Sequence, residues 1–288
     1  MGRRSMQRIT AIWPFYIQAC LISWFAWLPG LVLSSRRNYP LFVGPDFFRI
    51  FQGTFVDATH AIAVTLFWFA FFGPLLSALA ITYRTGGAKG LRALLQKTIH
   101  WRVHRKWYLA AVGLPIVNVL PAIGIAYATG IANDQPALPL AAGLIPLFFL
   151  LQLMTNGLQE VGWRGFALPY LQWRTSAEQA SYLIGVLWTV WYLPYVLTVS
   201  GGPRLLFDLI GLAAYLVGSS VIYAWLYNHT ASLCLVILYH TIASVAIALT
   251  IGLLGTHPAL PIVVGLTTWA IASPMLRHGL EHRARPRR

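Results

Sequence analysis

The chain has 288 residues, of which 58% are hydrophobic and only 10% are charged, with 21 Lys and Arg against 7 Asp and Glu. Soluble domains are about 45–50% apolar and about 25% charged, so this composition excludes a soluble globular domain, a disordered chain and a coiled coil. In a soluble protein, the net charge of +14 would suggest nucleic-acid binding.

Long segments without Asp, Glu, Lys or Arg predict the membrane-spanning helices, because about 20 apolar residues in a helix cross the hydrocarbon core of a bilayer. The longest segment, 209–276, is interrupted at Asn228-His229 and again at 255–258, where turn-forming residues cluster. We therefore expect an all-α, polytopic membrane protein that forms a single membrane domain over 1–288. Its eight expected spans are 11–33, 58–83, 107–130, 138–159, 179–199, 207–228, 230–254 and 259–276.

The distribution of basic residues predicts the orientation of these spans. With eight spans both termini lie on one side of the membrane, and 17 of the 21 Lys and Arg fall on that side. The other four are Arg36, Arg37, Arg49 and Arg204. Because cytoplasmic loops are enriched in Lys and Arg, we expect a multi-pass protein of the cytoplasmic (inner) membrane with both termini, including the basic tail 277–288, in the cytoplasm. The positive charge is then an orientation signal, and no nucleic-acid partner is expected.

Three further features are assigned structural roles. Cys20 and Cys234 lie inside expected spans without any paired metal-ligand spacing, which favours small residues of the membrane core. The segment 88–100 has leucines at helical spacing opposite Lys and Arg, which predicts an amphipathic helix on the cytoplasmic membrane surface. No internal repeat of the kind found in transporters is recognised.

Polar side chains inside the expected spans are the candidates for function, because burying them in a membrane is costly. The first group, TNGLQEVGWRG, closes the fourth span at 155–165. Glu160 and Arg164 are four residues apart on a helix and are expected to pair, since buried charges need partners. Taken alone, this pair also fits a helix end at the membrane interface.

Two more polar groups lie in the fifth and seventh spans. The sequence WTVWYLPY (188–195) has Tyr192 beside Pro194, which frees a backbone carbonyl one turn earlier. By itself this group also fits an aromatic belt. The sequence YHTIAS (239–244) places His240 and Ser244 one turn apart on the same helix face. A lone histidine of this kind also fits an ordinary core residue with its hydrogen bonds satisfied.

Taken in order, the three groups resemble the CPBP family, which comprises type II CAAX prenyl proteases and bacteriocin-processing or immunity (Abi) membrane proteins. That family carries Glu-Glu-x-x-x-Arg, then Phe-x-x-x-His, then His-x-x-x-Asn. QEVGWRGFALPYL (159–171) resembles EELGWRGFLLPRL, and WTVWYLP (188–194) resembles FGLWHLP. The resemblance covers about 72–250, and the N-terminal helix and loop at 1–57 lie outside this range. The resemblance implies a CAAX-protease-like helical bundle.

The resemblance implies intramembrane proteolysis, the activity of a peptidase. In the family, the first Glu of motif one and the His of motif two activate a water molecule, and the His and Asn of motif three stabilise the oxyanion. These four positions correspond here to Gln159, Tyr192, His240 and Ser244, while Glu160 and Arg164 match the structural part of motif one.

Three of the four chemical positions depart from the family pattern. An amide at Gln159 can position a water molecule but cannot take its proton, and general-base catalysis is worth about 10²–10⁴-fold. Tyr192 is a hydrogen-bond donor at neutral pH rather than a ready base, and Ser244 has a shorter reach than Asn. Metal dependence has been proposed for the family, but one imidazole with Gln and Tyr is a poor donor set, so no cofactor is expected.

We expect the six motif residues to gather in one cavity, whose wall also includes Asn156, Thr189 and Tyr239. The first hypothesis is a CPBP-type protein with impaired catalysis that binds a membrane-anchored or hydrophobic peptide there, with the bilayer as its other partner. The second is an active glutamate-dependent intramembrane protease that uses Glu160 and His240, although a carboxylate held by an arginine is a weaker base.

The third hypothesis is a transporter or channel. Asp57 and Asp208 are the acidic residues to consider as ion ligands, but both lie near span ends, where a solvated side chain is the simpler explanation. The absence of an internal repeat and of a mid-span acid also argues against transport.

Overall fold

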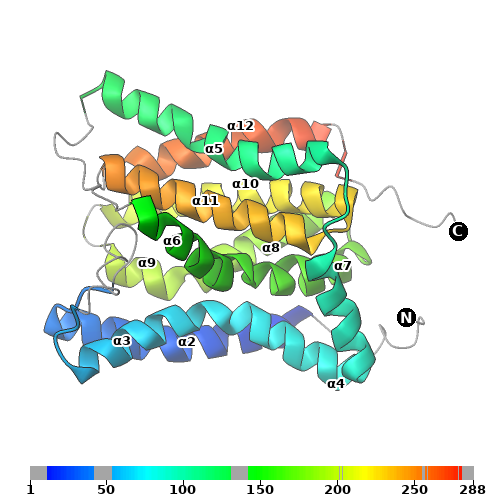
Figure 1. Ribbon diagram of the computed structural model, residues 1–288, viewed down its shortest axis with the longest axis horizontal. Coiled ribbons are helices and arrows are strands. Elements are labelled where there is room, and N and C mark those ends of the chain that lie inside the picture. Colours follow the sequence, from blue (N-terminus) through cyan, green and yellow to red (C-terminus); the bar gives the residue numbers. More distant parts are fainter. Residues whose placement is uncertain are drawn as a thin grey trace, which may run out of the picture.

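The computed structural model describes residues 12–41, 54–130, 142–200, 202, 204–254, 257, 259–277 and 279–280. Within these ranges the chain is helical, contains no β-strand, and packs its helices side by side along a common direction (Figure 1). This confirms the all-α, polytopic membrane fold. The helices are α2 (Ile12–Arg37), α3 (Ala58–Phe69), α4 (Gly73–Gln96), α5 (Arg105–Ala128), α6 (Ile145–Gln152), α7 (Leu168–Gln172), α8 (Ala177–Trp191), α9 (Leu193–Val199), α10 (Arg204–Thr230), α11 (Leu233–Leu254) and α12 (Ala259–Arg277).

Seven helical segments among the described residues are long and apolar enough to cross a membrane. The span expected at 58–83 is longer than predicted, because α3, a 3₁₀ turn and α4 follow one another without a loop. The break expected at Asn228-His229 occurs two residues later, where α10 ends at Thr230 and Ala231 adopts a positive φ of 52°. The seven segments are Ile12–Arg37, Ala58–Ile99, Arg105–Ala128, Ala177–Thr198, Arg204–Thr230, Leu233–Leu254 and Ala259–Arg277.

The eighth expected span, 138–159, has a different construction. Consecutive helical segments run from residue 142 to residue 172, and two of them, Leu153–Gly157 and Val161–Ala167, are π-helical. No single α-helix in this stretch therefore reaches spanning length, although α6 and α7 lie toward opposite ends of the bundle (Figure 1). Widened π turns are frequent at functional sites. The start of the expected span, like the terminal part of the basic tail (281–288), lies outside the described residues.

The predicted helix at 88–100 forms as a continuation of α4 beyond a bend. Gly87 has φ 60° and ψ −160°, a conformation that side chains with a Cβ rarely adopt, and the helix changes direction there (Figure 1). Within this segment the side chain of Leu94 is buried, whereas those of Leu95 and Ile99 are exposed. A helix is therefore present over most of the predicted range, and its position on the cytoplasmic membrane surface stays a prediction.

A chain of buried hydrogen bonds joins α8 to α2. Trp191 Nε1 donates to Ser23 Oγ over 2.8 Å, and Ser23 Oγ donates to the carbonyl of Ala70 over 2.7 Å. Because these groups have no water to bind inside a membrane, each bond fixes the position of the helix that carries it. The end of α8, immediately before Tyr192, is held in place by this contact.

Close backbone contact positions the π-helical segment against α4. A Cβ added at Gly162 would lie less than 3.0 Å from the backbone of Pro74, closer than real Cβ atoms come. Gly162→Ala is therefore expected to destabilise the fold by about 1–3 kcal/mol, the usual cost of overpacking. Thermal unfolding in detergent measures this loss.

The matched control for that substitution is Gly113→Ala in α5, where an added Cβ meets nothing within 4 Å. This variant is expected to unfold at the wild-type temperature or slightly above it, because alanine favours a helix over glycine. Equal unfolding temperatures for Gly162→Ala and Gly113→Ala would contradict the close contact with α4.

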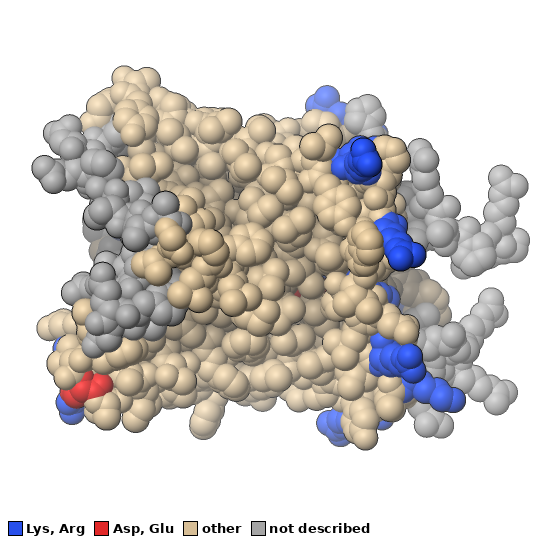
Figure 2. Space-filling model, in the orientation of Figure 1, with Lys and Arg blue, Asp and Glu red and all other residues tan. Residues whose placement is uncertain are grey.

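Basic side chains of the described surface gather at one end of the bundle. Figure 2 shows them at the end where α4 ends and α5 begins, and α2 begins and α12 ends at this same end (Figure 1). Arg36, Arg37 and Asp57 belong to the opposite end, at the junction of α2 and α3. This arrangement agrees with an even number of crossings.

Candidate active site

Three charged or ionisable side chains meet in the interior of the bundle. Arg164 Nη1 lies 3.0 Å from Glu160 Oε1 and 2.9 Å from Oε2, and His240 Nδ1 lies 2.8 Å from Glu160 Oε1. Glu160 and Arg164 are fully buried and His240 is 3% exposed. The ion pair expected between Glu160 and Arg164 is therefore present, and α11 adds His240 to it. Pairing of this kind is what allows a carboxylate to stay charged away from water.

Two aromatic rings from other helices enclose the arginine. The guanidinium carbon of Arg164 lies 4.8 Å from the ring centre of Trp188 in α8 and 4.7 Å from that of Tyr223 in α10. The imidazole of His240 is 5.1 Å from the Trp188 ring and 5.4 Å from the Tyr223 ring. Because a cation is attracted to the face of an aromatic ring, these contacts hold the guanidinium in one orientation.

A second cluster is built from amides and one phenol. Asn156 Oδ1 accepts hydrogen bonds from Gln159 Nε2 over 3.2 Å and from the hydroxyl of Tyr192 over 3.3 Å. The Asn156 amide group also donates to Gln152 Oε1. Asn156 thus joins the π-helical segment to the α8–α9 junction. Gln159 is fully buried, and its Oε1 has no hydrogen-bond partner among the described residues.

The two clusters are neighbours. Gln159 and Glu160 are consecutive residues between the two π-helical segments, so that one faces Asn156 and the other faces His240. Trp188 contacts both clusters, since its ring is 5.1 Å from the His240 ring and 6.5 Å from the Tyr192 ring. The structure thereby brings five of the six expected motif residues into one region.

The remaining predicted residues make other contacts. Thr189 Oγ1 donates to the carbonyl of Gly185 in its own helix over 2.9 Å. Tyr239 is buried, with its ring 5.0 Å from that of Tyr223. Ser244 is half-buried and makes no hydrogen bond to the described residues. None of these three is bonded directly to either cluster.

Sequence reasoning missed three residues of this region as site residues. They are Trp188, which stands where the second motif has phenylalanine, together with Gln152 and Tyr223. A polar Gln152 four residues before Asn156 was a usable signal, because residues at that spacing share a helix face. No sequence pattern distinguishes Tyr223 from the chain's other tyrosines.

The contact between His240 and Glu160 has a chemical consequence. A carboxylate only accepts hydrogen bonds, so the short contact requires a proton on His240 Nδ1. In the neutral ring, Nε2 then carries the lone pair and can accept a proton or a hydrogen bond. Both oxygens of Glu160 are occupied by Arg164, and Oε1 also by His240.

The donor set does not fit a metal ion. No group of three or more His, Cys, Asp and Glu side chains suited to a metal occurs in the part of the chain that the structure describes. The nearest approach is Glu160 with His240, and both oxygens of that carboxylate already bind the cation of Arg164. A second cation at this carboxylate would be repelled.

The two acids considered for ion transport are engaged in local contacts. Asp57 accepts from the hydroxyl of Tyr39 over 2.5 Å and from the backbone of His60 over 2.8 Å, and thereby caps α3. Asp208 accepts from Ser200 over 2.6 Å and from Arg204 over 3.0 Å. Each carboxylate therefore already accepts hydrogen bonds from neighbouring side chains or backbone, so its presence does not require a bound ion.

Comparison with known proteins gives two matches. Residues 141–246 match the family model described as type II CAAX prenyl endopeptidase Rce1-like. A 52-residue stretch is 42% identical to "CAAX prenyl protease 2" of Methanococcus maripaludis and covers 18% of this chain. It also spans only 19% of that relative's length.

The family match covers the chain from α6 to the first part of α11, which carries both clusters. The resemblance stated from the three motifs is thus confirmed over the residues that form the candidate site. The chain is a polytopic, all-α membrane protein that is similar over residues 141–246 to the type II CAAX prenyl endopeptidases.

Proposed function

We propose that this protein is a pseudoenzyme of the CPBP family, which binds a membrane-anchored or hydrophobic peptide in the region around Asn156 and Tyr192 and hydrolyses peptide bonds poorly. One observation carries the proposal. The position of the family's catalytic glutamate holds Gln159, and the adjacent carboxylate, Glu160, already has both oxygens bound to Arg164.

Neither residue is suited to activate a water molecule. The amide of Gln159 cannot take a proton, and protonating Glu160 would remove the negative charge that keeps Arg164 paired in the interior. The hydroxyl of Tyr192 donates a hydrogen bond to Asn156 Oδ1, and a neutral phenol is not a ready base. Loss of a general base lowers the rate of the catalysed reaction by about 10²–10⁴-fold.

Binding of a peptide is supported by the exposure of the second cluster. Glu160, Arg164 and Gln159 are fully buried, whereas Asn156 and Tyr192 are half-buried and so remain open to their surroundings. Gln159 Oε1 has no hydrogen-bond partner among the described residues, but it is buried behind this surface, so a peptide would meet Asn156 and Tyr192 first.

The proposal includes the orientation of the chain. The end of the bundle that carries most Lys and Arg faces the cytoplasm, in accordance with the enrichment of these residues in cytoplasmic loops. A peptide anchored in the cytoplasmic leaflet would approach from this side.

The test uses the full-length chain in lipid nanodiscs with synthetic peptides that carry a farnesyl or a palmitoyl group. We expect the wild type to retain such peptides and to leave them intact, as judged by mass spectrometry. Cleavage by the wild type that disappears in His240→Ala would overturn the proposal, because it would show that the site is catalytic as it stands.

The contact between Glu160 and His240 favours a second candidate function, an active intramembrane protease. In that case Glu160 orients the imidazole, and Nε2 of His240 takes the proton from water, by the logic of carboxylate–histidine pairs in hydrolases. Glu160→Gln separates the two functions. If the wild type cleaves the peptide and Glu160→Gln binds it but no longer cleaves it, the protease function is supported. If both proteins bind the peptide and the wild type cleaves none, the pseudoenzyme is supported.

A further inference from the structure

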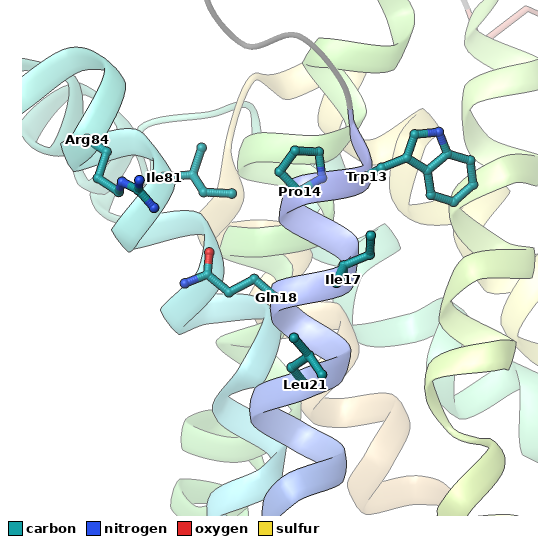
Figure 3. A pocket seen from close by; sticks show the side chains of 7 residues that line it. All are labelled: Trp13, Pro14, Ile17, Gln18, Leu21, Ile81 and Arg84. Atoms are coloured by element: carbon teal, nitrogen blue, oxygen red, sulfur yellow. The ribbon is translucent and has the colours of Figure 1, made fainter.

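A groove lies on the outer face of the bundle between α2 and α4, away from both polar clusters (Figure 3). It has a volume of about 550 Å³. Its α2 wall includes Trp13, Ile17 and Leu21, which are spaced four residues apart and therefore form one helix face. Their exposed fractions are 50%, 53% and 62%. Since α2 is a membrane-spanning candidate, this face meets the hydrocarbon of the bilayer.

The groove has the dimensions of part of an acyl chain. From Trp13 to Leu21 the helix rises about 12 Å. Ile81 of α4 also lines the groove, so a hydrocarbon chain lying in it would contact apolar side chains from both helices.

One end of the groove is polar and positively charged. Arg84 is exposed and has no ion pair or hydrogen bond with any described residue. Gln18 Oε1 accepts from Ser77 over 3.4 Å, which leaves its amide N–H groups available. Figure 3 shows the amide of Gln18 projecting from α2 toward α4 and the guanidinium of Arg84 projecting from α4 toward α2. Two sets of N–H donors therefore face a common space.

We propose that this groove binds one anionic phospholipid. Its phosphate accepts hydrogen bonds from Arg84 and Gln18, and one acyl chain lies along Ile17, Leu21 and Ile81. A guanidinium matches the geometry and charge of a phosphate. An arginine near the cytoplasmic surface attracts anionic lipid. Arg84 meets that condition because it lies three residues before the bend at Gly87, near the end of α4 where the basic residues gather. The inference shares the orientation of the chain with the proposed function but does not depend on the proposed peptide site.

The first experiment is native mass spectrometry of the full chain released from micelles with equal amounts of phosphatidylglycerol and phosphatidylcholine. We expect the wild type to retain phosphatidylglycerol preferentially. Arg84→Gln is expected to lower that preference about fivefold, the effect of one basic residue near an anionic surface. The matched control is Arg92→Gln, which removes an exposed charge from α4 outside the groove and is expected to leave the preference unchanged.

The second variant tests the apolar part of the groove. Ile17→Trp fills part of the groove and is expected to abolish retention of the lipid, whereas Leu28→Trp, at another exposed position of α2, is expected to retain it. All four variants change exposed side chains, and their unfolding temperatures verify that they fold. An equal loss in Arg84→Gln and Arg92→Gln would overturn the proposal, and so would wild-type retention by Ile17→Trp.

Discussion

Combining Gln159→Glu with Tyr192→His is expected to produce cleavage of lipid-anchored peptides at a rate about 10²–10⁴-fold above the wild type, the usual contribution of a general base. The double substitution places a carboxylate and an imidazole at the two positions that Asn156 now connects by hydrogen bonds. Rotation of the Asn156 amide would let its N–H₂ donate to the new carboxylate. Peptide fragments quantified by mass spectrometry measure the gain.

Two controls accompany this gain of function. Each single substitution is expected to give much less cleavage than the pair, because a base and its partner act as a unit. His240→Ala in the doubly substituted chain is expected to remove the new activity, since the third motif would then lack its imidazole. A doubly substituted protein that folds and binds peptide but cleaves none would contradict the assignment of Gln159 and Tyr192 to the altered catalytic positions.

Arg164→Met is expected to lower the free energy of unfolding by about 3–5 kcal/mol. The substitution leaves Glu160 charged and fully buried without its main partner, and breaking a buried pair from one side carries a cost of this size. It also removes the contacts of the guanidinium with the rings of Trp188 and Tyr223. Unfolding of the purified protein in mixed micelles, titrated with denaturing detergent, measures the loss.

The control for this prediction is the combination of Arg164→Met with Glu160→Gln. Removing both charges abolishes the unpaired carboxylate, so the double variant is expected to be more stable than Arg164→Met alone. Additive losses from the two single substitutions would show that Glu160 and Arg164 are not coupled, contrary to the 2.9 Å contact between them.

Much of the site followed from local sequence because its parts are close along the chain. Glu160 and Arg164 are four residues apart, and this spacing places two side chains together on any helix. The position of His240 followed from the order of the three motifs. The spans themselves followed from hydropathy, because a bilayer requires long apolar helices whose backbone hydrogen bonds are satisfied internally.

Other features depended on the packing of distant segments. His240 reaches Glu160 across 80 residues, and Tyr223 comes from yet another helix. The two π-helical segments, which turn Gln159 toward Asn156 and Glu160 toward His240, were not visible in a pattern read with ordinary helical periodicity. The same segments explain why the fourth expected span contains no long α-helix.

The sequence by itself determined that this is a multi-pass, all-α membrane protein that resembles the CAAX prenyl proteases, with Gln159 and Tyr192 where the resemblance places Glu and His. Composition, charge distribution and motif order are properties of the linear chain. Only the tertiary structure decided that Glu160 is saturated by Arg164 and His240, and that Asn156 connects Gln159 with Tyr192. Hydrogen bonds between different helices depend on distances and orientations of a few tenths of an ångström, which arise from packing and not from spacing along the chain.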